Sequence, residues 1–384
     1  MTSIRLPTDL PFPTFVVGSL PRPQWIRELI EDRKAGRLSD ASAEALLDDA
    51  IPSAIRLQER AGLDFLSDGE WRRESYVKVF ADAVDGFLPD LIPSGPASST
   101  LMYPAVVAPL RPRRPIAAAA AAFLKAHTTS RVIVALPSPY TIARRMWSPE
   151  HSRDAYATRE EFLTACIPIV RQEIHRLADL GVHAIQLDDP WLALLVDPAY
   201  RERAGITDVD HEIELSIHGV NGATEGLWEV GNTGKVGESG EAGESKAGKV
   251  LLSVHLCHAH SNRRHSTRGP YDLIVGALGR MNVHRFAMEF ATPDAEGIGV
   301  LERFPENKIL GLGVIDHTDR RVETPEQVVQ RAEAAMRFVP QERLSLNTDC
   351  GFAPSSVNPM DLDEAYLKLK SLCQGAALLR EKYA

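Results

Sequence analysis

The sequence predicts an α/β protein built as a single (β/α)8 barrel with surface insertions. Short apolar runs rich in β-branched residues alternate with amphipathic segments along the whole chain, which is typical of parallel α/β folds. Polar candidate residues follow the ends of several of these runs, and a barrel gathers the carboxyl ends of all its strands around one pocket. No GxGxxG follows the first run and no GxxxxGK[ST] occurs, so a doubly wound nucleotide-binding sheet has little support.

The expected elements follow from hydrophobic periodicity and from glycine and proline positions. Strands are expected in the run before Gly18 and Ser19, at Leu63–Ser67, Arg131–Pro137, before Asp188, from Val250 on, and at His284–Phe290, Lys308–Ile315 and Arg343–Asn347. Helices are expected at Trp25–Arg37, Ser42–Ala61, Ile116–His127, Glu160–Leu180, Tyr271–Gly279, Thr324–Phe338 and Asp361–Tyr383. An irregular excursion or hairpin is expected at Asp85–Pro115, and a loop at SPYTIARRMW, residues 138–147.

We expect residues 1–384 to form one catalytic domain. The stretch 219–249 is rich in Gly, Ser, Glu and Lys and predicts a flexible surface insertion within that domain, with Trp228 as the residue that could hold it to the surface. A strand follows directly, so we do not interpret the stretch as a linker between domains.

Composition excludes several classes of protein. The net charge is −9 with both signs interspersed, which offers no basic surface for nucleic acid or for an anionic membrane. No apolar run reaches the ~18 residues of a membrane span, and the first residues lack an apolar segment of signal-peptide length. The four cysteines are too few and too scattered for a disulfide scaffold, so we expect reduced thiols in a cytoplasmic protein.

A candidate metal site begins at the stretch VLLSVHLCHAH. His255 and Cys257 are two residues apart in an expected strand, so both side chains point to the same side. Glu289 and Cys350 lie at the ends of two later apolar runs. Two thiolates with one imidazole and one carboxylate suit Zn²⁺ and argue against an all-oxygen magnesium or calcium site. The alternative for these residues by themselves is ordinary barrel-strand positions and a buried thiol.

Other chemically capable residues also follow expected strands. They are Ser19, Glu70, Asp188 and His317. An apolar strand that ends in carboxylates is a recurrent way to build a site, because the sheet fixes the backbone while the carboxylates reach a pocket. The sequence assigns no role to His211, His218, His258 or His260.

Eight motifs in order give the chain a family resemblance. They are VVGSLPRP, LSDGEWRR, ALPSPYTIARRMW, AIQLDDPWL, SVHLCHAH, AMEFA, GLGVIDHTDRRVETPEQV and NTDCGF, which span Val16 to Pro354. With these motifs the chain resembles the cobalamin-independent methionine synthases, within the barrel superfamily that also contains uroporphyrinogen decarboxylase. The resemblance is to the catalytic C-terminal barrel of the long enzyme, and the chain looks like a short, single-barrel member.

The resemblance implies a zinc-dependent S-methyltransferase. Zinc would be held by His255, Cys257, Glu289 and Cys350; Ser19, Glu70 and Asp188 would contact the amino acid part of a homocysteine-like thiol; and His317 would donate a proton. The methyl donor implied is a 5-methylfolate or a methylcorrinoid protein, and the product methionine or another thioether.

Alternative functions stay open from the sequence. One is zinc-dependent alkyl transfer to another thiol, as in the relatives that open epoxides with coenzyme M. Another is a non-catalytic tetrapyrrole- or corrinoid-binding member of the superfamily. A zinc hydrolase usually has His and carboxylate ligands with an open position for water, which two cysteines disfavour. A purely structural zinc site is the last alternative, and it predicts that metal removal unfolds the protein.

Overall fold

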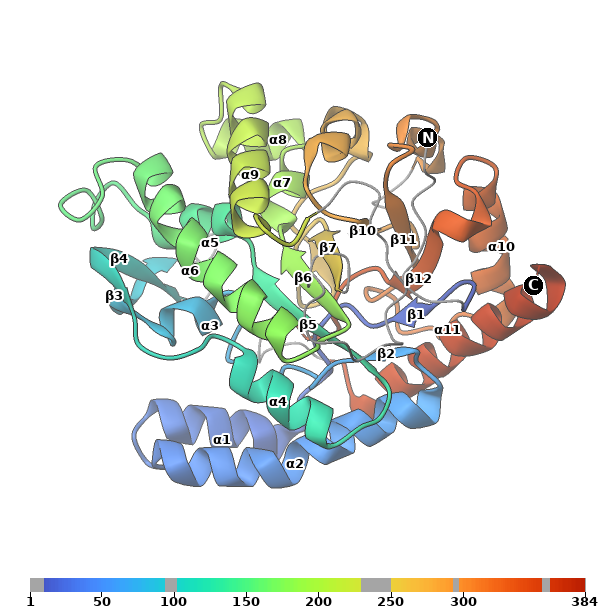
Figure 1. Cartoon of the computed structure of the whole chain (residues 1–384), viewed down its shortest axis with the longest axis horizontal. Coiled ribbons are helices and arrows are strands. Elements are labelled where there is room, and N and C mark those ends of the chain that lie inside the picture. The colour runs from blue at the N-terminus through green and yellow to red at the C-terminus, as the bar shows by residue number, and fades with distance from the viewer. Residues whose placement is uncertain (1–9, 94–101, 229–249, 293–296, 354–359, 384) are drawn as a thin grey trace.

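A closed barrel of parallel strands organises the chain (Figure 1). The computed structural model describes residues 10–93, 102–228, 250–292, 297–353 and 360–383. In the order in which neighbours are hydrogen-bonded, the barrel strands are β1 (Thr14–Phe15), β12 (Leu344–Thr348), β11 (Ile309–Ile315), β10 (Arg285–Met288), β7 (Leu251–Leu256), β6 (Ala184–Asp188), β5 (Arg131–Pro137) and β2 (Phe65–Leu66), which pairs with β1 again. The predicted (β/α)8 barrel is therefore confirmed.

Helices surround the barrel and connect its strands (Figure 1). The α-helices are α1 (Gln24–Lys34), α2 (Asp40–Ala61), α3 (Lys78–Ala81), α4 (Ala118–Ala126), α5 (Pro139–Met146), α6 (Arg159–Asp179), α7 (Pro190–Leu194), α8 (Pro198–Arg203), α9 (Val209–Ala223), α10 (Pro325–Met336) and α11 (Leu362–Tyr383). The 3₁₀ helices are η1 (Tyr271–Leu273), η2 (Val275–Arg280), η4 (Ile298–Arg303) and η5 (Gln341–Arg343). Two antiparallel pairs lie outside the barrel: β3 (Val84–Pro93) with β4 (Met102–Pro112), and β8 (His260–Ser261) with β9 (Arg264–His265).

Three expectations about elements are corrected by the structure. The stretch expected as a loop after β5 contains α5, because the Ser138 hydroxyl accepts the Thr141 N–H at 2.9 Å and caps a helix that begins with Pro139. The segment Tyr271–Gly279 forms 3₁₀ turns instead of an α-helix. Residues 219–223 are the end of α9, so a flexible segment cannot begin at residue 219.

The glycines of α9 explain the last error. A Cβ at Gly222 would lie 2.8 Å from Cγ2 of Ile167 on α6, so glycine here allows two helices to pack closely and does not indicate flexibility. Trp228 packs on the His284 ring at 4.8 Å between ring centres, as expected for a residue that holds this end of the segment in place. Residues 229–249, where most of the predicted insertion falls, lie outside the described residues.

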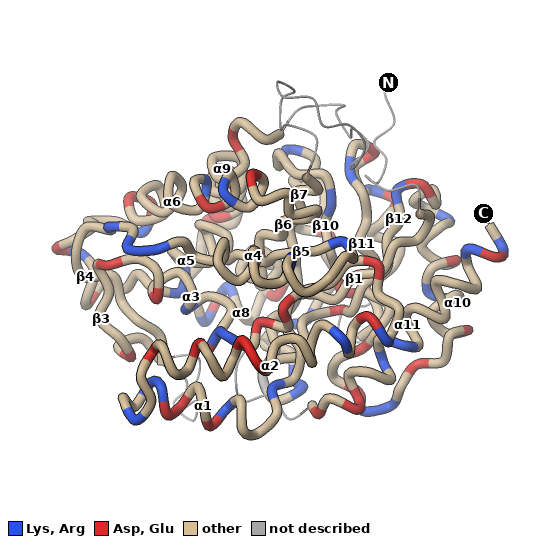
Figure 2. The backbone as a smooth tube through the Cα atoms, turned by 60° about the horizontal axis from the view of Figure 1, so that its bottom comes forward, with Lys and Arg blue, Asp and Glu red and all other residues tan. Residues whose placement is uncertain are grey.

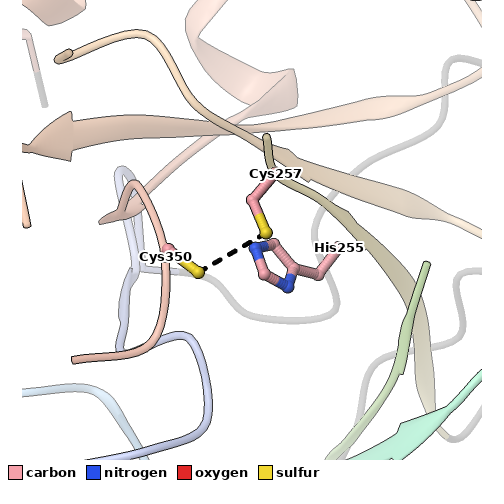
Figure 3. Close-up of side chains that lie close together, drawn as sticks. All are labelled: His255, Cys257 and Cys350. Carbon is pink, nitrogen blue, oxygen red and sulfur yellow. Dashed lines mark hydrogen bonds between the residues drawn. The ribbon is translucent and has the colours of Figure 1, made fainter. Parts of the chain in front are cut away.

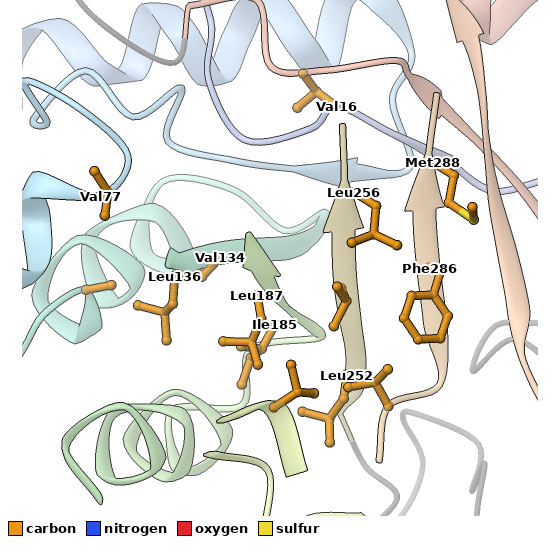
Figure 4. Close-up of a cluster of buried hydrophobic side chains, with 14 of the residues drawn as sticks. Val16, Val77, Val134, Leu136, Ile185, Leu187, Leu252, Leu256, Phe286 and Met288 are labelled. Atoms are coloured by element: carbon orange, nitrogen blue, oxygen red, sulfur yellow. The ribbon is translucent and has the colours of Figure 1, made fainter. Parts of the chain in front are cut away.

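Side chains alternate along each strand between the barrel interior and the surrounding helices. The outward-facing residues of β5, β6, β7 and β10 are apolar and belong to one large buried cluster (Figure 4). The inward-facing residues start with an apolar layer at the amino ends of the strands: Phe15, Phe65, Ile133, Ala184, Leu251 and Ile309. Above it the interior becomes polar; Arg285 donates to Ser253, Ser345 and Asn347. The apolar layer therefore closes the amino end of the barrel, and polar side chains line the interior toward the carboxyl end.

The charged residues are distributed as the sequence predicts. Basic and acidic residues are interspersed along the tube in Figure 2, without a face of one sign that dominates the view. Within the described ranges, every helix is too short or too polar to cross a membrane.

Candidate functional site

A cluster of one histidine and two cysteines lies at the carboxyl end of the barrel (Figure 3). Leu251, Ser253 and His255 alternate inward along β7, and Cys257 continues this face just after the strand. Cys350 comes from the turn after β12, and its Sγ lies 3.5 Å from Sγ of Cys257. The ligand atoms of His255, Cys257 and Cys350 all lie within 4.8 Å of one another, and the three residues are buried.

The orientation of His255 is fixed from the neighbouring strand. Asp188 is its register partner on β6, and Oδ1 of Asp188 lies 3.2 Å from Nδ1 of His255. The same carboxylate oxygen accepts from Nε2 of Gln186 at 2.9 Å. Nε2 of His255 is buried and has no hydrogen-bond partner in the described part of the chain. A carboxylate on one ring nitrogen and an open second nitrogen is the usual arrangement of a metal-binding histidine.

The residues present fit a zinc ion. Two thiolates bound tetrahedrally to zinc at about 2.3 Å would have their sulfurs ~3.8 Å apart, close to the 3.5 Å separation seen here. The hydrogen bond from Cys350, helped by the nearby His255, lowers the pKa of the Cys257 thiol although burial opposes this shift. Burial raises the pKa of Cys350 well above its ordinary value. The two shifts therefore favour the thiolate form of Cys257 and the protonated form of Cys350.

Glu289, the fourth predicted ligand, lies with a different group. At the end of β10, its Oε2 is 2.7 Å from Nδ1 of His258 and accepts the His258 backbone N–H at 3.0 Å. Nε2 of His265 is 3.6 Å from the same oxygen. Ligand atoms of Glu289, His265 and His317 lie within 4.8 Å of one another and form a second group beside the first. The structure therefore brings three of the four predicted ligands together and places the fourth in the adjacent group.

His317 is buried beside other histidines. Its ring centre is 4.0 Å from that of His260 and 5.1 Å from that of His265. Neither of its ring nitrogens has a partner among the residues that the structure describes. Burial and then the facing His260 lower the pKa of His317 well below its ordinary value, so the ring is neutral. The segment GVIDHTD would by itself also allow a surface histidine in a polar loop, and the full burial of His317 excludes that interpretation.

Glu70 lies in the loop after β2 and is buried. Its backbone has a φ of 57°, and Oε1 lies 3.1 Å from Nη1 of Arg73. Burial raises the pKa of Glu70 to about 7, and the charge of Asp188 at the barrel mouth adds to this shift. Gly18 has a φ of 64°, and a Cβ there would lie 2.6 Å from Oε1 of Glu70. Glycine is therefore required for this approach.

Ser19 links the first strand to the loop of Cys350. Its hydroxyl accepts the backbone N–H of Ala353, three residues after Cys350, at 3.1 Å. Asp188, Glu70 and Ser19 all lie in loops or strand ends at the carboxyl side of the barrel, as predicted, whereas their contacts with a substrate stay a prediction. Asp189, which directly follows Asp188 in the sequence, accepts from Thr141 and Ser216 and joins the barrel to α5 and α9.

Sequence reasoning missed the histidines that follow the His-x-Cys pattern. His258 is fully buried between Glu289 and the Gly269 carbonyl, and His260 and His265 lie on the hairpin β8–β9 that folds over the barrel mouth. A signal was present, because these histidines follow a strand end directly and the chain must turn there into the pocket. Asp349 was also missed; its carboxylate accepts the N–H groups of residues 290–292 and holds the loop after Glu289 against the loop of Cys350.

A surface cavity of about 630 Å³ lies away from these groups. It is lined by residues of α6, α9 and the segment before β10, including Arg171 and Asn221. None of the predicted site residues contributes to it.

Comparison with known proteins gives matches over most of the chain. The family described as the catalytic domain of cobalamin-independent synthases matches residues 12–220 and 248–375. A methionine synthase of Saccharolobus solfataricus is 26% identical over 375 residues, which cover 96% of this chain and 95% of the relative. One of Thermococcus kodakarensis is 27% identical over 382 residues, with 98% and 96% covered.

Solved structures show the same fold. A B12-independent methionine synthase from Shewanella sp. W3-18-1 in complex with selenomethionine superposes with a TM-score of 0.77 at 23% identity, over 97% of this chain and 98% of that one. A putative vitamin-B12-independent methionine synthase from Listeria monocytogenes gives a TM-score of 0.69 at 20% identity, over 97% and 99%. From the match over most of its length, the chain belongs to the family of the catalytic domain of cobalamin-independent synthases.

Proposed function

We propose that the protein transfers a methyl group from a 5-methylfolate to the thiol of homocysteine, on a zinc ion held by His255, Cys257 and Cys350. The observation that carries the proposal is the buried cluster of these side chains, in which Nε2 of His255 has no partner among the described residues. Full-length relatives named methionine synthase support the reaction, and the cobalamin-independent family supports a folate donor over a corrinoid protein.

The bound zinc ion would lower the pKa of a coordinating thiol, so that the acceptor sulfur is a thiolate at neutral pH. The protein contributes the position of this sulfur. Asp188 and Gln186 fix the ring of His255, and Asp349 fixes the loops on either side, so the ligand atoms need little rearrangement. Glu289 stays the proposed fourth ligand, and the atom that it would offer is Oε1, which has no partner in the described residues.

The amino acid part of the acceptor would lie against Glu70, Asp188 and Ser19. The two carboxylates suit the ammonium group, and a cation placed between them would favour their charged forms. This matters for Glu70, because its pKa of about 7 leaves the free carboxyl partly protonated at neutral pH. The Ser19 hydroxyl suits the acceptor carboxylate as a hydrogen-bond donor.

Departure of a folate nitrogen requires a proton, and His317 is the proposed donor. The ring is neutral in the free protein, so it would give its own N–H proton as the leaving nitrogen becomes basic. Its two ring nitrogens make no hydrogen bond to a described residue, so one can face the donor without breaking a contact.

The test is zinc X-ray absorption of the protein loaded with one equivalent of zinc, with and without L-homocysteine, together with an assay of methionine formed from 5-methyltetrahydrofolate. We expect two sulfurs in the zinc shell, a third sulfur when the thiol is added, and methionine as product. A shell that is unchanged by homocysteine would contradict homocysteine as the acceptor. A third sulfur without methionine formation would contradict the folate donor.

A further inference from the structure

A second group of metal-binding side chains lies next to the cysteine cluster. It consists of His265 from the hairpin β8–β9, Glu289 at the end of β10, and His317 after β11. The side chains of His265 and Glu289 are 1% and 0% exposed, and His317 is fully buried. Three segments that are far apart in the sequence thus bring two imidazoles and a carboxylate together within 4.8 Å.

Several atoms of this group have unused bonding capacity. Both ring nitrogens of His317, Oε1 of Glu289 and Nδ1 of the adjacent His260 are buried and make no hydrogen bond to any residue in the described ranges. Leaving a buried polar atom without a partner destabilises the folded state, and native proteins keep few such atoms. Four such atoms on three neighbouring residues indicate that something other than the protein satisfies them.

His258 holds the carboxylate of this group in place. Its Nδ1 faces Oε2 of Glu289 at 2.7 Å, and its Nε2 faces the Gly269 carbonyl at 2.9 Å. Both ring nitrogens of His258 therefore face oxygen acceptors, so this ring acts as a donor that orients Glu289 and is not itself a ligand. Such an outer partner is common for carboxylates that bind metals.

We propose that His265, Glu289 and His317 form a second cation site, for a divalent transition-metal ion such as Zn²⁺, separate from the His255, Cys257 and Cys350 centre. Two imidazoles and one carboxylate are the ligand set of many zinc and non-haem iron sites. His260 could complete the site, because its ring centre is 4.0 Å from that of His317 and its Nδ1 has no described partner. The absence of sulfur distinguishes this site chemically from the first.

The second site goes beyond the proposed function and does not depend on it. Oε1 of Glu289 is the atom proposed for the cysteine centre, so Oε2, which lies 3.6 Å from Nε2 of His265 and is oriented by His258, would bind this second cation. A cation on one ring nitrogen of His317 also leaves the N–H of the other nitrogen, which is compatible with His317 as a proton donor.

The test is a zinc titration of the full chain after removal of metal with a chelator under reducing conditions. Zinc per chain is measured after dialysis, and the ligand shell by X-ray absorption. We expect two zinc ions in the unmodified protein. The pair His265→Ala and His317→Ala would retain one zinc with a sulfur-containing shell. The pair Cys257→Ser and Cys350→Ser would retain one zinc with a shell of nitrogen and oxygen only. His211→Ala, which removes an exposed histidine on α9, is the matched control and would retain both ions.

One zinc per chain in the unmodified protein, lost in the cysteine pair and kept in the histidine pair, would overturn the second site and leave the proposed function intact. Two zinc ions with no additional sulfur when homocysteine binds would support the second site and contradict the proposed acceptor. The two proposals therefore fail separately.

Cobalt substitution of the unmodified protein gives a measurement that needs no variant to fold. A cobalt ion bound to thiolates has intense charge-transfer absorption, whereas one bound to imidazole and carboxylate has only weak visible bands. We expect a first equivalent with the intense bands and a second equivalent with weak bands alone. Saturation at one equivalent would contradict the second site.

Discussion

Both ends of the barrel contain buried polar residues, but the two ends differ in whether the polar atoms of these residues are hydrogen-bonded. At the amino end, Nδ1 of His284 accepts the Leu252 N–H at 3.0 Å, and Nζ of Lys308 donates to the carbonyls of Met281 and Val283 at 2.6 and 2.8 Å. At the carboxyl end, His255 and His317 have ring nitrogens without a partner among the described residues. Both sets are buried and titratable, and in the described part of the chain only the second set includes buried side-chain atoms that make no hydrogen bond.

The difference shows which observation indicates a site. Burial lowers the pKa of His284 to about 4 and that of Lys308 to about 8, shifts that often mark functional groups. Here, however, His284 and Lys308 form hydrogen bonds with backbone groups in or just before barrel strands, so we infer that these two residues hold the strands together. Unsatisfied buried atoms, and not the size of a pKa shift, distinguish the functional end.

The largest effect is expected from the cysteine cluster. Cys257→Ser should lower zinc affinity by more than about 100-fold, because loss of an outer-sphere partner alone costs 10–100-fold. Methyl transfer should be lost with the metal, while the unfolding midpoint changes little. The measurement is zinc retained against a competing chelator, with methionine formation in parallel. Cys166→Ala, at a buried thiol on α6 away from the barrel mouth, is the control and should keep zinc. Equal zinc loss in both variants would contradict the assignment of the metal site to the cysteine cluster at the carboxyl end of the barrel.

His317→Gln comes next. Removal of a proton donor should lower kcat for folate-dependent methyl transfer by about 100-fold or more, because general acids contribute 10²–10⁴-fold. Zinc at the cysteine centre and the binding of homocysteine should be retained, since His317 is not part of that cluster. The measurement is kcat and KM for both substrates, together with zinc content. An unchanged kcat would contradict the assignment of His317.

Lys308→Met tests the opposite end. The substitution leaves two buried carbonyls, those of Met281 and Val283, without their donor, so the free energy of unfolding should fall by about 1–3 kcal/mol. Zinc content and kcat should not change. Urea unfolding measures the effect, and Lys370→Met at an exposed position of α11 serves as the control. A loss of zinc in Lys308→Met with unchanged stability would reverse the roles assigned to the two ends.

The smallest effect concerns acid stability. His284 has a folded-state pKa of about 4 against 6.5 unfolded, so its contribution is complete above pH 6.5 and is lost as the pH falls toward 4. Between pH 6.5 and 5 the loss should be about 1.6 kcal/mol, because the full slope of 1.36 kcal/mol per pH unit is reached only well below the unfolded pKa. His284→Asn, which keeps an acceptor near the Nδ1 position, should be less sensitive to acid over this range. The check is urea unfolding of both proteins at several pH values, and parallel curves would contradict the account.

Several features were predictable from the sequence because they are local. Hydrophobic runs located all eight barrel strands, and the two-residue repeat of a strand placed His255 on the same side as Cys257. The hairpin of β3 and β4 was also among the expectations for Asp85–Pro115. Each of these follows from neighbours a few residues apart in the chain.

Other features depended on contacts between distant segments. Local composition made the end of α9 look flexible, because the pattern of glycines does not show that Ile167 of α6 packs against Gly222. The strand repeat placed Glu289 at the barrel mouth but could not show that two histidines from earlier segments, His258 and His265, surround its carboxylate. The sequence determined which residues reach the carboxyl end of the barrel, since strand parity is local. Only the tertiary structure decided which of them meet, because loop side chains take their direction from the segments packed against them.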